Sequence, residues 1–303
     1  LAIKKLRALA NEVPLPASRE GPGVGTPRTQ APFLLAVGYF KPHLPFNSPK
    51  KYWNLYDEAN IPISPIPFIP EGINNASLHG SGELNGYQLG DEKAGLAAPV
   101  SEEYARKLRH AYAACVSYID EQIGILLEEL ETLGLDENTH VIIWGDHGWH
   151  LGDQNVWGKH TVFDFATRST LIIKPSSEYR VPSTDFKNTN IKSIVGTVDL
   201  YPTIMNLCQV DMPYAGDGVS LVPLMENPEL ETWENAKFSY FRRGVSLRTE
   251  RYRMTKYSRK QEPTIELFDH TTDPYESRNI AAENPKIIDS LMQIWEKGNT
   301  GIW

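Results

Sequence analysis

The sequence predicts an α/β fold: a mixed, mostly parallel sheet flanked by helices, followed by a small C-terminal α+β subdomain that contains an antiparallel sheet. Three observations lead to this prediction. Continuous apolar runs at residues 33–38 and 140–144 are typical of strands buried on both faces. A long amphipathic pattern at residues 101–133 separates them, and strand, helix, strand is the βαβ pattern of a parallel sheet. After residue 226, short half-polar runs separated by turns indicate an antiparallel meander.

The amino-terminal third combines one helix, one strand and long loops. Apolar residues at Ile3, Leu6 and Leu9 form a short helical stripe. Residues 14–30 are rich in Pro, Gly, Ser and Thr, which predicts a loop, and residues 41–100 show little periodicity. A loop as long as the second one is usually functional or wraps the surface of a domain.

The long helix is the clearest element of the sequence. Ser101 is a suitable N-cap, and Gly134 supplies a stop. The apolar positions step by three and four residues: Tyr104, Leu108, Ala111, Cys115, Tyr118, Ile119, Leu126, Leu130 and Leu133. Further along the chain, residues 140–144 and 170–173 predict strands and residues 198–208 predict a helix.

The smaller subdomain is predicted from the change in pattern near its start. An amphipathic helix through Ile287, Leu291 and Ile294 closes the predicted meander. The four runs that predict its strands are residues 238–241, 244–248, 252–256 and 264–268. We therefore divide the chain into an α/β domain, residues 1–225, and an α+β subdomain, residues 226–303.

Composition and charge exclude several classes of protein. The 303 residues hold 30 Lys+Arg and 38 Asp+Glu, a formal net charge of −8, so we predict no nucleic-acid partner. The longest apolar stretch is about nine residues against the roughly 20 of a membrane helix, so we predict no membrane partner. Cys115 and Cys208 form neither a disulfide framework nor a cysteine-based zinc site.

A polar turn directly after the strand at residues 140–144 is the first candidate for chemistry. Residues 145–150 are Gly-Asp-His-Gly-Trp-His, and ligands of open parallel sheets bind at the carboxyl ends of the strands. The flanking glycines allow Asp146 and His147 to reach one ion, which a carboxylate and an imidazole predict to be Ca²⁺, Mg²⁺ or Zn²⁺. The alternative is that Asp146 caps the next turn and His147 is a hydrogen-bonded surface residue.

Two further polar clusters belong to the same edge of the predicted sheet. Lys159 lies in the loop after this turn, where a lysine can hold a phosphate or sulfate oxyanion; the alternative is a solvated loop lysine. Lys41 and His43 follow the strand at residues 33–38, where a lone histidine is more often structural than catalytic. Because one sheet edge would gather these clusters, we expect His43 and Lys159 to converge on one pocket.

Four segments, spread in the right order over nearly the whole chain, carry a resemblance to a known family. They are residues 31–46, 112–120, 146–159 and 267–276. They resemble the sulfatase family of the alkaline-phosphatase superfamily, specifically its iduronate-2-sulfatase-like branch. The resemblance implies a mixed α/β sheet flanked by helices and the hydrolysis of a sulfate ester on a sugar, as in the degradation of a glycosaminoglycan or sulfated polysaccharide. It also implies Ca²⁺ as cofactor and a sulfated saccharide as ligand.

The resemblance further implies roles for individual residues. Asp146 and His147 match two ligands of the family's single Ca²⁺, and His147 is typical of this branch because many sulfatases have Asn there. Lys159 matches the lysine that contacts the sulfate group. His43 matches a histidine of the sulfate pocket, which can donate a proton to the leaving alcohol. We therefore predict Asp146 and His147 as metal ligands and His43 and Lys159 as catalytic residues.

Three more residues complete the predicted site as substrate-binding residues. Trp149 occupies a position that faces the sugar in this branch, although a Trp that packs the turn is the alternative. Lys41 and His150 belong to the same two motifs and are predicted to bind substrate. Gln154 and Asn155 stand where the branch often has His-Gly, a difference expected to alter the substrate rim.

One part of the family's chemistry is missing from these 303 residues. Sulfatases use a formylglycine made from Cys or Ser in Cys/Ser-x-Pro-x-Arg, and neither Cys115 nor Cys208 has that context. The nearest imitation, residues 15–19, has the wrong spacing. The paired aspartates that complete the calcium site are also missing. Since the chain begins with Leu1 inside a predicted helix, we expect it to be incomplete at its N-terminus, with the nucleophile upstream, and to be inactive alone.

Two alternatives stay open beside the sulfatase. One is a catalytically incompetent sulfatase fragment that binds a sulfated glycan or a partner, and the other is a phosphodiesterase or phosphonate hydrolase of the same superfamily. A two-zinc phosphatase is disfavoured, because His150, His160 and His270 lack the usual Gly-x-His-Gly setting. The resemblance implies a periplasmic, secreted or lysosomal location, and an N-terminal chain of the same precursor as a further partner.

Overall fold

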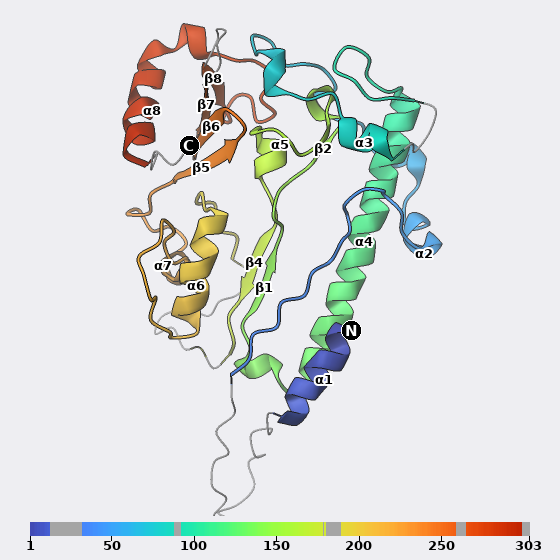
Figure 1. Cartoon of the computed structure of the whole chain (residues 1–303), viewed down its shortest axis with the longest axis vertical. Coiled ribbons are helices and arrows are strands. Elements are labelled where there is room, and N and C mark those ends of the chain that lie inside the picture. Colours follow the sequence, from blue (N-terminus) through green and yellow to red (C-terminus); the bar gives the residue numbers. More distant parts are fainter. Residues whose placement is uncertain (13–31, 88–91, 178, 180–188, 259–264, 299–303) are drawn as a thin grey trace, which may run out of the picture. The chain divides into compact units, whose positions relative to one another are not determined.

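The computed structural model describes residues 1–12, 32–87, 92–177, 179, 189–258 and 265–298 (Figure 1). The chain divides into two compact units, and the helix α4 (Glu102–Thr132) and the strand β1 (Val141–Trp144) each contribute to both. The first unit comprises Leu1–Ile61, His110–Ile142 and Ile173–Arg180; the second comprises Pro62–Arg109, Ile143–Ile172 and Val181–Trp303. Within the described residues, no helix combines the length and the apolar character that crossing a membrane requires.

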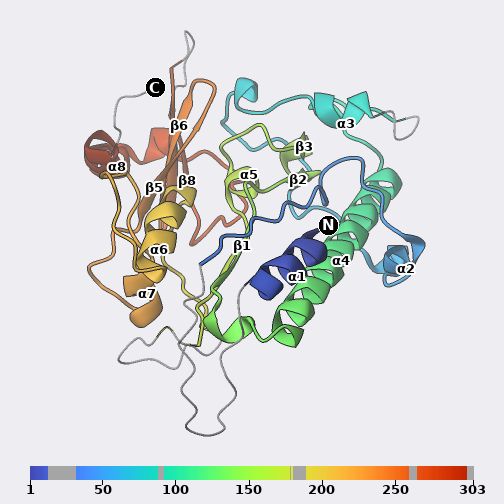
Figure 2. The same ribbon diagram turned by 60° about the horizontal axis from the view of Figure 1, so that its bottom comes forward.

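The core of the first unit lies between α1 (Ala2–Glu12) and α4, which run side by side in Figures 1 and 2. Leu6, from the apolar stripe predicted for this helix, is buried against Leu130 and Leu135. On the outer side, Arg7 Nε lies 2.7 Å from Glu129 Oε1. Burial of each such leucine stabilises the fold by about 1.5–3 kcal/mol. The predicted short helix and the predicted long helix are both confirmed.

Residues 33–38 are extended but do not form the predicted strand. Phe33 and Leu35 pack on the core of Leu6 and Leu130, whereas Leu34 between them is 85% exposed. Side chains that alternate in this way have one packed face rather than two. No other described strand is hydrogen-bonded to this segment. The apolar run correctly predicted an extended backbone, but the prediction of a strand buried on both faces is wrong. A strand needs a neighbouring strand to pair with, and the composition of the run does not reveal whether one is present.

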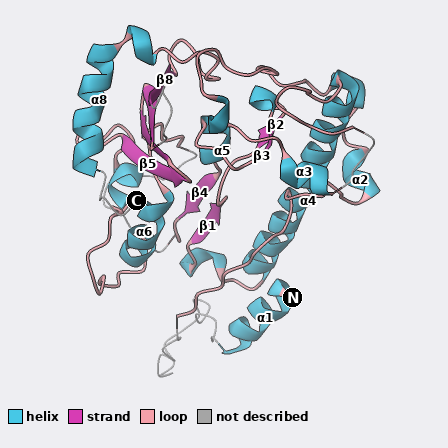
Figure 3. Cartoon of the chain, turned by 45° about the horizontal axis from the view of Figure 1, so that its top comes forward, coloured by secondary structure: helices cyan, strands magenta, loops and turns pink. Residues whose placement is uncertain are grey.

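The strands predicted at residues 140–144 and 170–173 are confirmed as β1 and β4 (Leu171–Lys174), which pair with each other (Figure 3). Trp144 is 49% exposed and Ile172 54% exposed, because among the described strands β1 and β4 have only one another as partners. The mixed α/β character is therefore confirmed. The hairpin β2–β3 (residues 150–158) and the four-stranded sheet of the described chain are both antiparallel. The mostly parallel sheet predicted for the α/β domain therefore stays a prediction.

The predicted long loop contains only short helical segments, and the chain after β1 forms a small antiparallel hairpin. The loop segments are α2 (Lys50–Trp53), η1 (Glu58–Asn60), η2 (Asn75–Ser77) and α3 (Gly82–Gly86). After η3 (Asp136–Asn138) and β1 come β2 (His150–Leu151), η4 (Asp153–Asn155), β3 (Trp157–Gly158) and α5 (Asp164–Thr167). Asp153 is buried in this hairpin and accepts hydrogen bonds from Ser64 Oγ (2.6 Å) and Leu151 N (2.7 Å). These bonds fix the hairpin to the preceding loop.

The predicted helix at residues 198–208 is confirmed, and the predicted meander follows it. The helical segments are η5 (Thr197–Asp199), α6 (Leu200–Leu207), α7 (Val222–Glu226), η6 (Ala281–Glu283) and α8 (Pro285–Gly298). The sheet has the order β5 (Ala236–Phe241), β6 (Gly244–Thr249), β7 (Tyr252–Tyr257), β8 (Ile265–Asp269). The two compact units are each built from several segments and do not divide at residues 225/226. The domain boundary predicted there stays a prediction.

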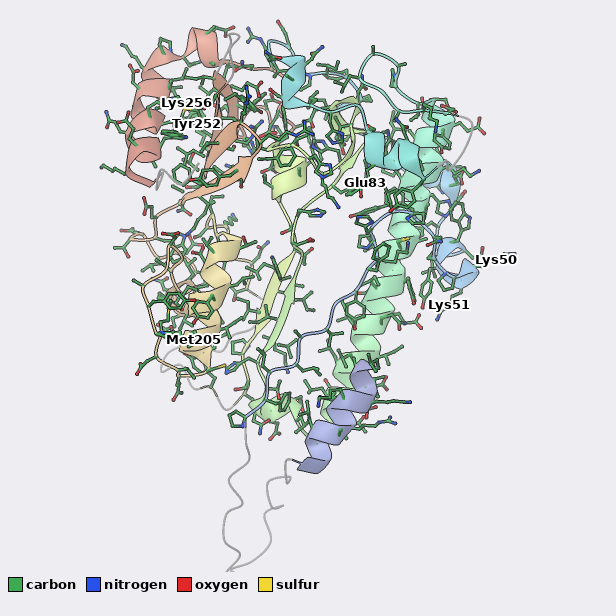
Figure 4. The ribbon with its side chains drawn as sticks, in the orientation of Figure 1. Lys50, Lys51, Glu83, Met205, Tyr252 and Lys256 are labelled. Atoms are coloured by element: carbon green, nitrogen blue, oxygen red, sulfur yellow. The ribbon has the colours of Figure 1, made fainter. Side chains whose placement is uncertain are left out.

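The helix α8 covers one face of this sheet. Leu247, Met254 and Leu267 are completely buried, and Leu291 of α8 belongs to the same core. Tyr252 and Lys256, labelled in Figure 4, lie on β7 beside α8. Lys256 Nζ lies 4.9 Å from the centre of the Trp295 ring. The amphipathic helix predicted through these apolar positions is confirmed.

A buried ion pair joins this sheet to the loop around α5. Arg253 of β7 and Glu276 are fully buried, and Arg253 Nε donates to Glu276 Oε1. His270 Nε2 lies 2.8 Å from the same carboxylate oxygen. The Arg253 guanidinium lies 4.4 Å and 4.6 Å from the ring centres of Phe163 and Phe268. Charge, hydrogen bonds and aromatic faces together offset part of the cost of removing water from both ions.

Candidate active site

Asp146 and His147 lie in the turn that follows β1. The backbone of the turn is fixed by a hydrogen bond from Gly148 N to Ala166 O (2.8 Å). A Cβ atom at position 148 would lie 2.1 Å from Phe165 O, so only glycine allows this approach to the backbone. The Asp146 side chain is 75% exposed and the His147 side chain 33% exposed. Both are therefore open to a ligand from solution.

The two side chains converge on one point. Asp146 Oδ2 and His147 Nε2 are 3.6 Å apart, close enough to bind the same cation. His147 Nδ1 lies 2.7 Å from Gly148 O, and since a carbonyl only accepts, Nδ1 donates and the neutral ring keeps its lone pair on Nε2. A hydrogen bond of this kind commonly orients metal-binding histidines.

The donor set fits part of a calcium site. Ca²⁺ takes six to eight oxygen ligands as a rule, and Asp146 and His147 supply two donors. Across the described part of the chain, no group of three or more His, Cys, Asp or Glu side chains is arranged to hold a metal ion. The remaining ligands would have to come from backbone, water or other residues. The calcium ion stays a prediction.

Lys159 lies just after β3 and faces α3. Its Nζ is 3.7 Å from Glu83 Oε1 and 5.4 Å from the centre of the Trp149 ring. The side chains of Lys159 and Glu83 are 20% and 22% exposed, and Figure 4 labels Glu83 on α3. The carboxylate and the ring hold the ammonium group in place, and an ammonium group is a cation that can attract an anion.

Trp149 connects Lys159 with the Asp146–His147 pair. Its ring centre is 6.4 Å from that of His147, and Lys159 lies over the ring. Four of the predicted site residues, Asp146, His147, Trp149 and Lys159, are therefore brought together within the second unit. A carboxylate–imidazole pair, an aromatic ring and an ammonium group in this order suit a ligand that carries an anionic group.

His150 does not lie where a substrate could reach it. Its side chain has no exposed surface, its Nε2 lies 2.8 Å from Thr161 Oγ1, and its ring packs near Phe163 and Phe165. Burial lowers its pKa to about 4. The prediction that His150 contacts substrate is corrected to a packing role. His150 is the first residue of β2, and the alternation of side chains along the strand turns it inward.

Lys41 and His43 lie in the first unit, in a loop that they help to fold. Lys41 Nζ donates to His43 O (3.2 Å) and to Pro45 O, which occupies two of its three N–H donors. Burial lowers the pKa of the Lys41 ammonium group. His43 Nδ1 donates to Leu44 O at 2.9 Å. Convergence of His43 with Lys159 stays a prediction.

Gln154 and Asn155 hold the hairpin rather than a substrate rim. Gln154 is completely buried, and its Nε2 donates to Tyr275 O at 3.0 Å. Asn155 Nδ2 donates to Leu96 O at 3.2 Å. Both residues have left-handed backbone conformations, with φ of 53° and 59°. The prediction that Gln154 alters the substrate rim is wrong, because its side-chain amide is buried in the fold.

Sequence reasoning missed Glu83 and His79, which support Lys159 and its loop. Both come from the segment at residues 41–100 that has no clear periodicity. The His79 ring packs against Gly158, where a Cβ atom would lie 2.6 Å from His79 Cε1. The glycines around Ser81 mark a turn but give no signal for either side chain. Only tertiary contacts reveal these two residues.

Neither cysteine of the chain has the surroundings of a catalytic nucleophile. Cys115 is a free thiol, completely buried in α4, and burial raises its pKa. Cys208 is free and exposed, one residue after α6. A buried thiol with a raised pKa is a poor nucleophile, because the thiolate is the reactive form. This agrees with the absence of Cys/Ser-x-Pro-x-Arg from the sequence.

Comparisons with known proteins agree with this geometry. The sulfatase family profile matches residues 24–210, and the profile of the N-sulphoglucosamine sulphohydrolase C-terminal region matches residues 145–298. The chain is 32% identical over 209 residues to iduronate 2-sulfatase of Mus musculus, covering 60% of this chain and 37% of that protein. It is 30% identical over 225 residues to N-acetylglucosamine-6-O-sulfatase of Bacteroides thetaiotaomicron, covering 70% of this chain and 38% of that protein.

A solved structure shares the fold. Phosphonate monoester hydrolase of Silicibacter pomeroyi matches with a TM-score of 0.65 and 22% identity, covering 85% of this chain and 54% of that chain. The chain thus spans less than two-fifths of the two curated relatives and about half of this structural relative. Because the sulfatase profile covers more than half of the 303 residues, the chain belongs to the sulfatase family of the alkaline-phosphatase superfamily.

Proposed function

We propose that the protein hydrolyses a sulfate ester on a saccharide and that the nucleophile lies outside these 303 residues. The arrangement of Asp146, His147, Trp149 and Lys159 carries this proposal. It offers a cation-binding pair 3.6 Å across and an ammonium group beside an aromatic ring. The relatives named for sulfated sugars, iduronate 2-sulfatase and N-acetylglucosamine-6-O-sulfatase, support a saccharide as substrate.

Each residue has a distinct part in this reaction. Lys159, positioned by its ion pair with Glu83, binds a sulfate oxygen as a point charge. Trp149 excludes water on one side of that group and offers its ring to the sugar. Asp146 and His147 hold Ca²⁺, which when bound would neutralise negative charge on the sulfate oxygens. The role of His43 as proton donor to the departing sugar alcohol stays a prediction.

Loss of the lysine charge tests the assignment of Lys159. In the full-length protein, we expect Lys159→Met to lower kcat/KM for a sulfated saccharide by about 10²–10³-fold, the cost of removing one preorganised donor to a developing oxyanion. The measurement is sulfate release. Lys192→Met, a change at an exposed lysine, is the matched control and should leave kcat/KM unchanged.

The same assay separates the alternatives. Full-length protein that cleaves a phosphonate monoester faster than the sulfate ester would support the phosphonate hydrolase instead. Protein that binds the sulfated saccharide without releasing sulfate would support a binding protein.

Calcium binding tests the Asp146–His147 pair. We expect Asp146→Asn to weaken Ca²⁺ binding by full-length protein at least about tenfold, because affinity follows the number of charged oxygen ligands. Titration calorimetry measures the affinity directly, without an activity assay. Asp211→Asn, at an exposed aspartate, is the matched control. Equal Ca²⁺ affinity for both variants would remove Asp146 from the metal site.

A further inference from the structure

A group of aromatic and cationic side chains begins at His160, the residue that follows Lys159 in the chain. The His160 ring stacks on Phe241 with ring centres 5.6 Å apart and 29° between the planes. Arg242 Cζ lies 5.2 Å from the centre of the same Phe241 ring. His160 and Arg242 are exposed, and Phe241 is half-buried. The group therefore presents an open surface made by two distant segments of the second unit.

The half-buried side chain of His79 supports this surface. The His79 ring meets His160 edge-on, with ring centres 5.8 Å apart, and packs on Gly158. Ser81 N donates to His79 Nδ1 at 3.1 Å, so the ring orientation is set by the backbone of its own turn. Burial, with the positive charges of nearby groups, lowers the pKa of His79 to about 4. His79 is therefore uncharged at neutral pH, and its edge-on contact positions the His160 ring.

The backbone at Arg242 is unusual for its residue type. Arg242 follows β5 in the tight β5–β6 turn, where Phe241 pairs with Gly244, and it has a φ of 52°. Such turns favour Gly, Asn or Asp, because other side chains are strained there. Strained residues of this kind cluster at ligand sites, where the rest of the structure maintains them. An arginine kept in this position points to a use for its charge.

The electrostatic surroundings favour an anion. Of the ionisable groups that act on the His160 ring, Glu83 is negative, Lys159 and Arg242 are positive, and His147 adds positive charge when protonated. Glu83 is already paired with Lys159 at 3.7 Å. The exposed guanidinium is therefore left as a cation on the surface of a chain whose net charge is −8. Arginine binds carboxylate and sulfate groups in a bidentate manner, which a lysine cannot do.

We propose that His160, Phe241 and Arg242 form a second subsite, beside Lys159, that binds a further anionic group of the saccharide. The proposal rests on the proposed sulfatase function and deepens it, since it names the substrate class: a sugar with a second sulfate or a carboxylate. Arg242 contacts that group, His160 and Phe241 offer their ring faces to the sugar, and His79 is a positioning residue. The sulfate ester to be cleaved lies at Lys159.

The test compares three saccharides on full-length protein: one with a single sulfate ester, the same sugar with a second sulfate, and the same sugar with a carboxylate. We expect Arg242→Ala to raise KM for one or both doubly anionic sugars by about 10- to 100-fold, the range for a lost charged hydrogen bond. The kcat values and the KM for the singly sulfated sugar should stay within about threefold. Whichever doubly anionic sugar is more affected identifies the group that is bound.

Two further variants make the result decisive. Arg243→Ala removes the next arginine of the same turn and should leave all KM values unchanged. His160→Ala should weaken binding of the doubly anionic sugars without affecting the others. Equal effects of Arg242→Ala and Arg243→Ala, or equal losses on singly and doubly anionic sugars, would overturn the subsite.

Calorimetry separates this proposal from the proposed function. If the wild-type protein releases no sulfate, the proposed function fails, and the Kd values of the same sugars for wild type and Arg242→Ala still decide the subsite. A selective loss of affinity for the doubly anionic sugars supports it. Affinities that do not differ between wild type and variant contradict it.

Discussion

Glu276→Gln is expected to lower the free energy of unfolding by about 3–5 kcal/mol, the usual cost of breaking a buried ion pair by removing one partner. Gln keeps the shape of the side chain but removes the charge, so Arg253 stays fully buried without its counter-ion. The aromatic faces of Phe163 and Phe268 cannot replace a carboxylate. Denaturant unfolding of the variant and the wild type measures the difference.

The matched control is the same substitution at an exposed pair. Glu283 Oε1 accepts from Arg278, and the Glu283 side chain is 55% exposed. Glu283→Gln should change the stability by only about 0–1 kcal/mol. If both variants lost the same small amount, the buried pair would not have the stabilising role assigned to it.

The pH dependence gives a second readout for Glu276. Burial alone would raise the pKa of its carboxyl. The charge of Arg253 and the hydrogen bond from His270 outweigh burial and lower the pKa to about 2. The unfolded state takes up a proton near 4.5 and the folded state only near 2, so the stabilisation is complete above 4.5. It is lost as the pH falls from there towards 2, by about 3 kcal/mol in total. Glu276→Gln should remove this part of the acid sensitivity.

This ion pair also supports the candidate active site. Glu276 Oε2 accepts from Asp164 N at 3.0 Å, at the start of α5. The same short helix supplies Ala166 O to Gly148 N in the turn of Asp146 and His147. A loosened α5 would therefore release one end of that turn. Hydrogen exchange in Glu276→Gln should be faster at the amide of Gly148 than in the wild type.

The sequence predicted the local parts of the fold well. Helix α4 has a strong period and ends at Thr132, and Gly134 has a φ of 63° as a helix stop requires. The four antiparallel strands and α8 follow from short-range alternation and turns. Residues 33–38 show the limit of such reasoning, because whether an apolar run pairs with a neighbour depends on residues far away in the chain.

The same division holds for the candidate site. Asp146 and His147 were predicted correctly as neighbours, because one glycine-flanked turn determines their geometry. Glu83 comes from a loop without periodicity, so nothing in its local sequence indicated its contact with Lys159. His150 belongs to the same motif as His147, but strand alternation in β2 buries it. Motif membership thus predicted location, whereas side-chain direction needed the structure.

The 303-residue chain produced alone is expected to release no sulfate above background, even with Ca²⁺ present. Lys159 and the Asp146–His147 pair can position a sulfate group, but positioning does not replace a covalent nucleophile that divides the reaction into two easier steps. No Cys/Ser-x-Pro-x-Arg segment occurs in the sequence, and Cys115 is buried in α4. The measurement is sulfate release from an aryl sulfate and from a sulfated disaccharide.

The control is the full-length protein, which should release sulfate under the proposed function. The lone chain should also tend to associate, because apolar side chains such as Leu34 (85% exposed) and Phe40 (65% exposed) face solvent in the first unit. Light scattering detects that association and shows whether inactivity has a trivial cause. Turnover by soluble, monomeric lone chain would contradict the prediction, since it would require a nucleophile among these 303 residues that neither cysteine nor any recognised motif accounts for.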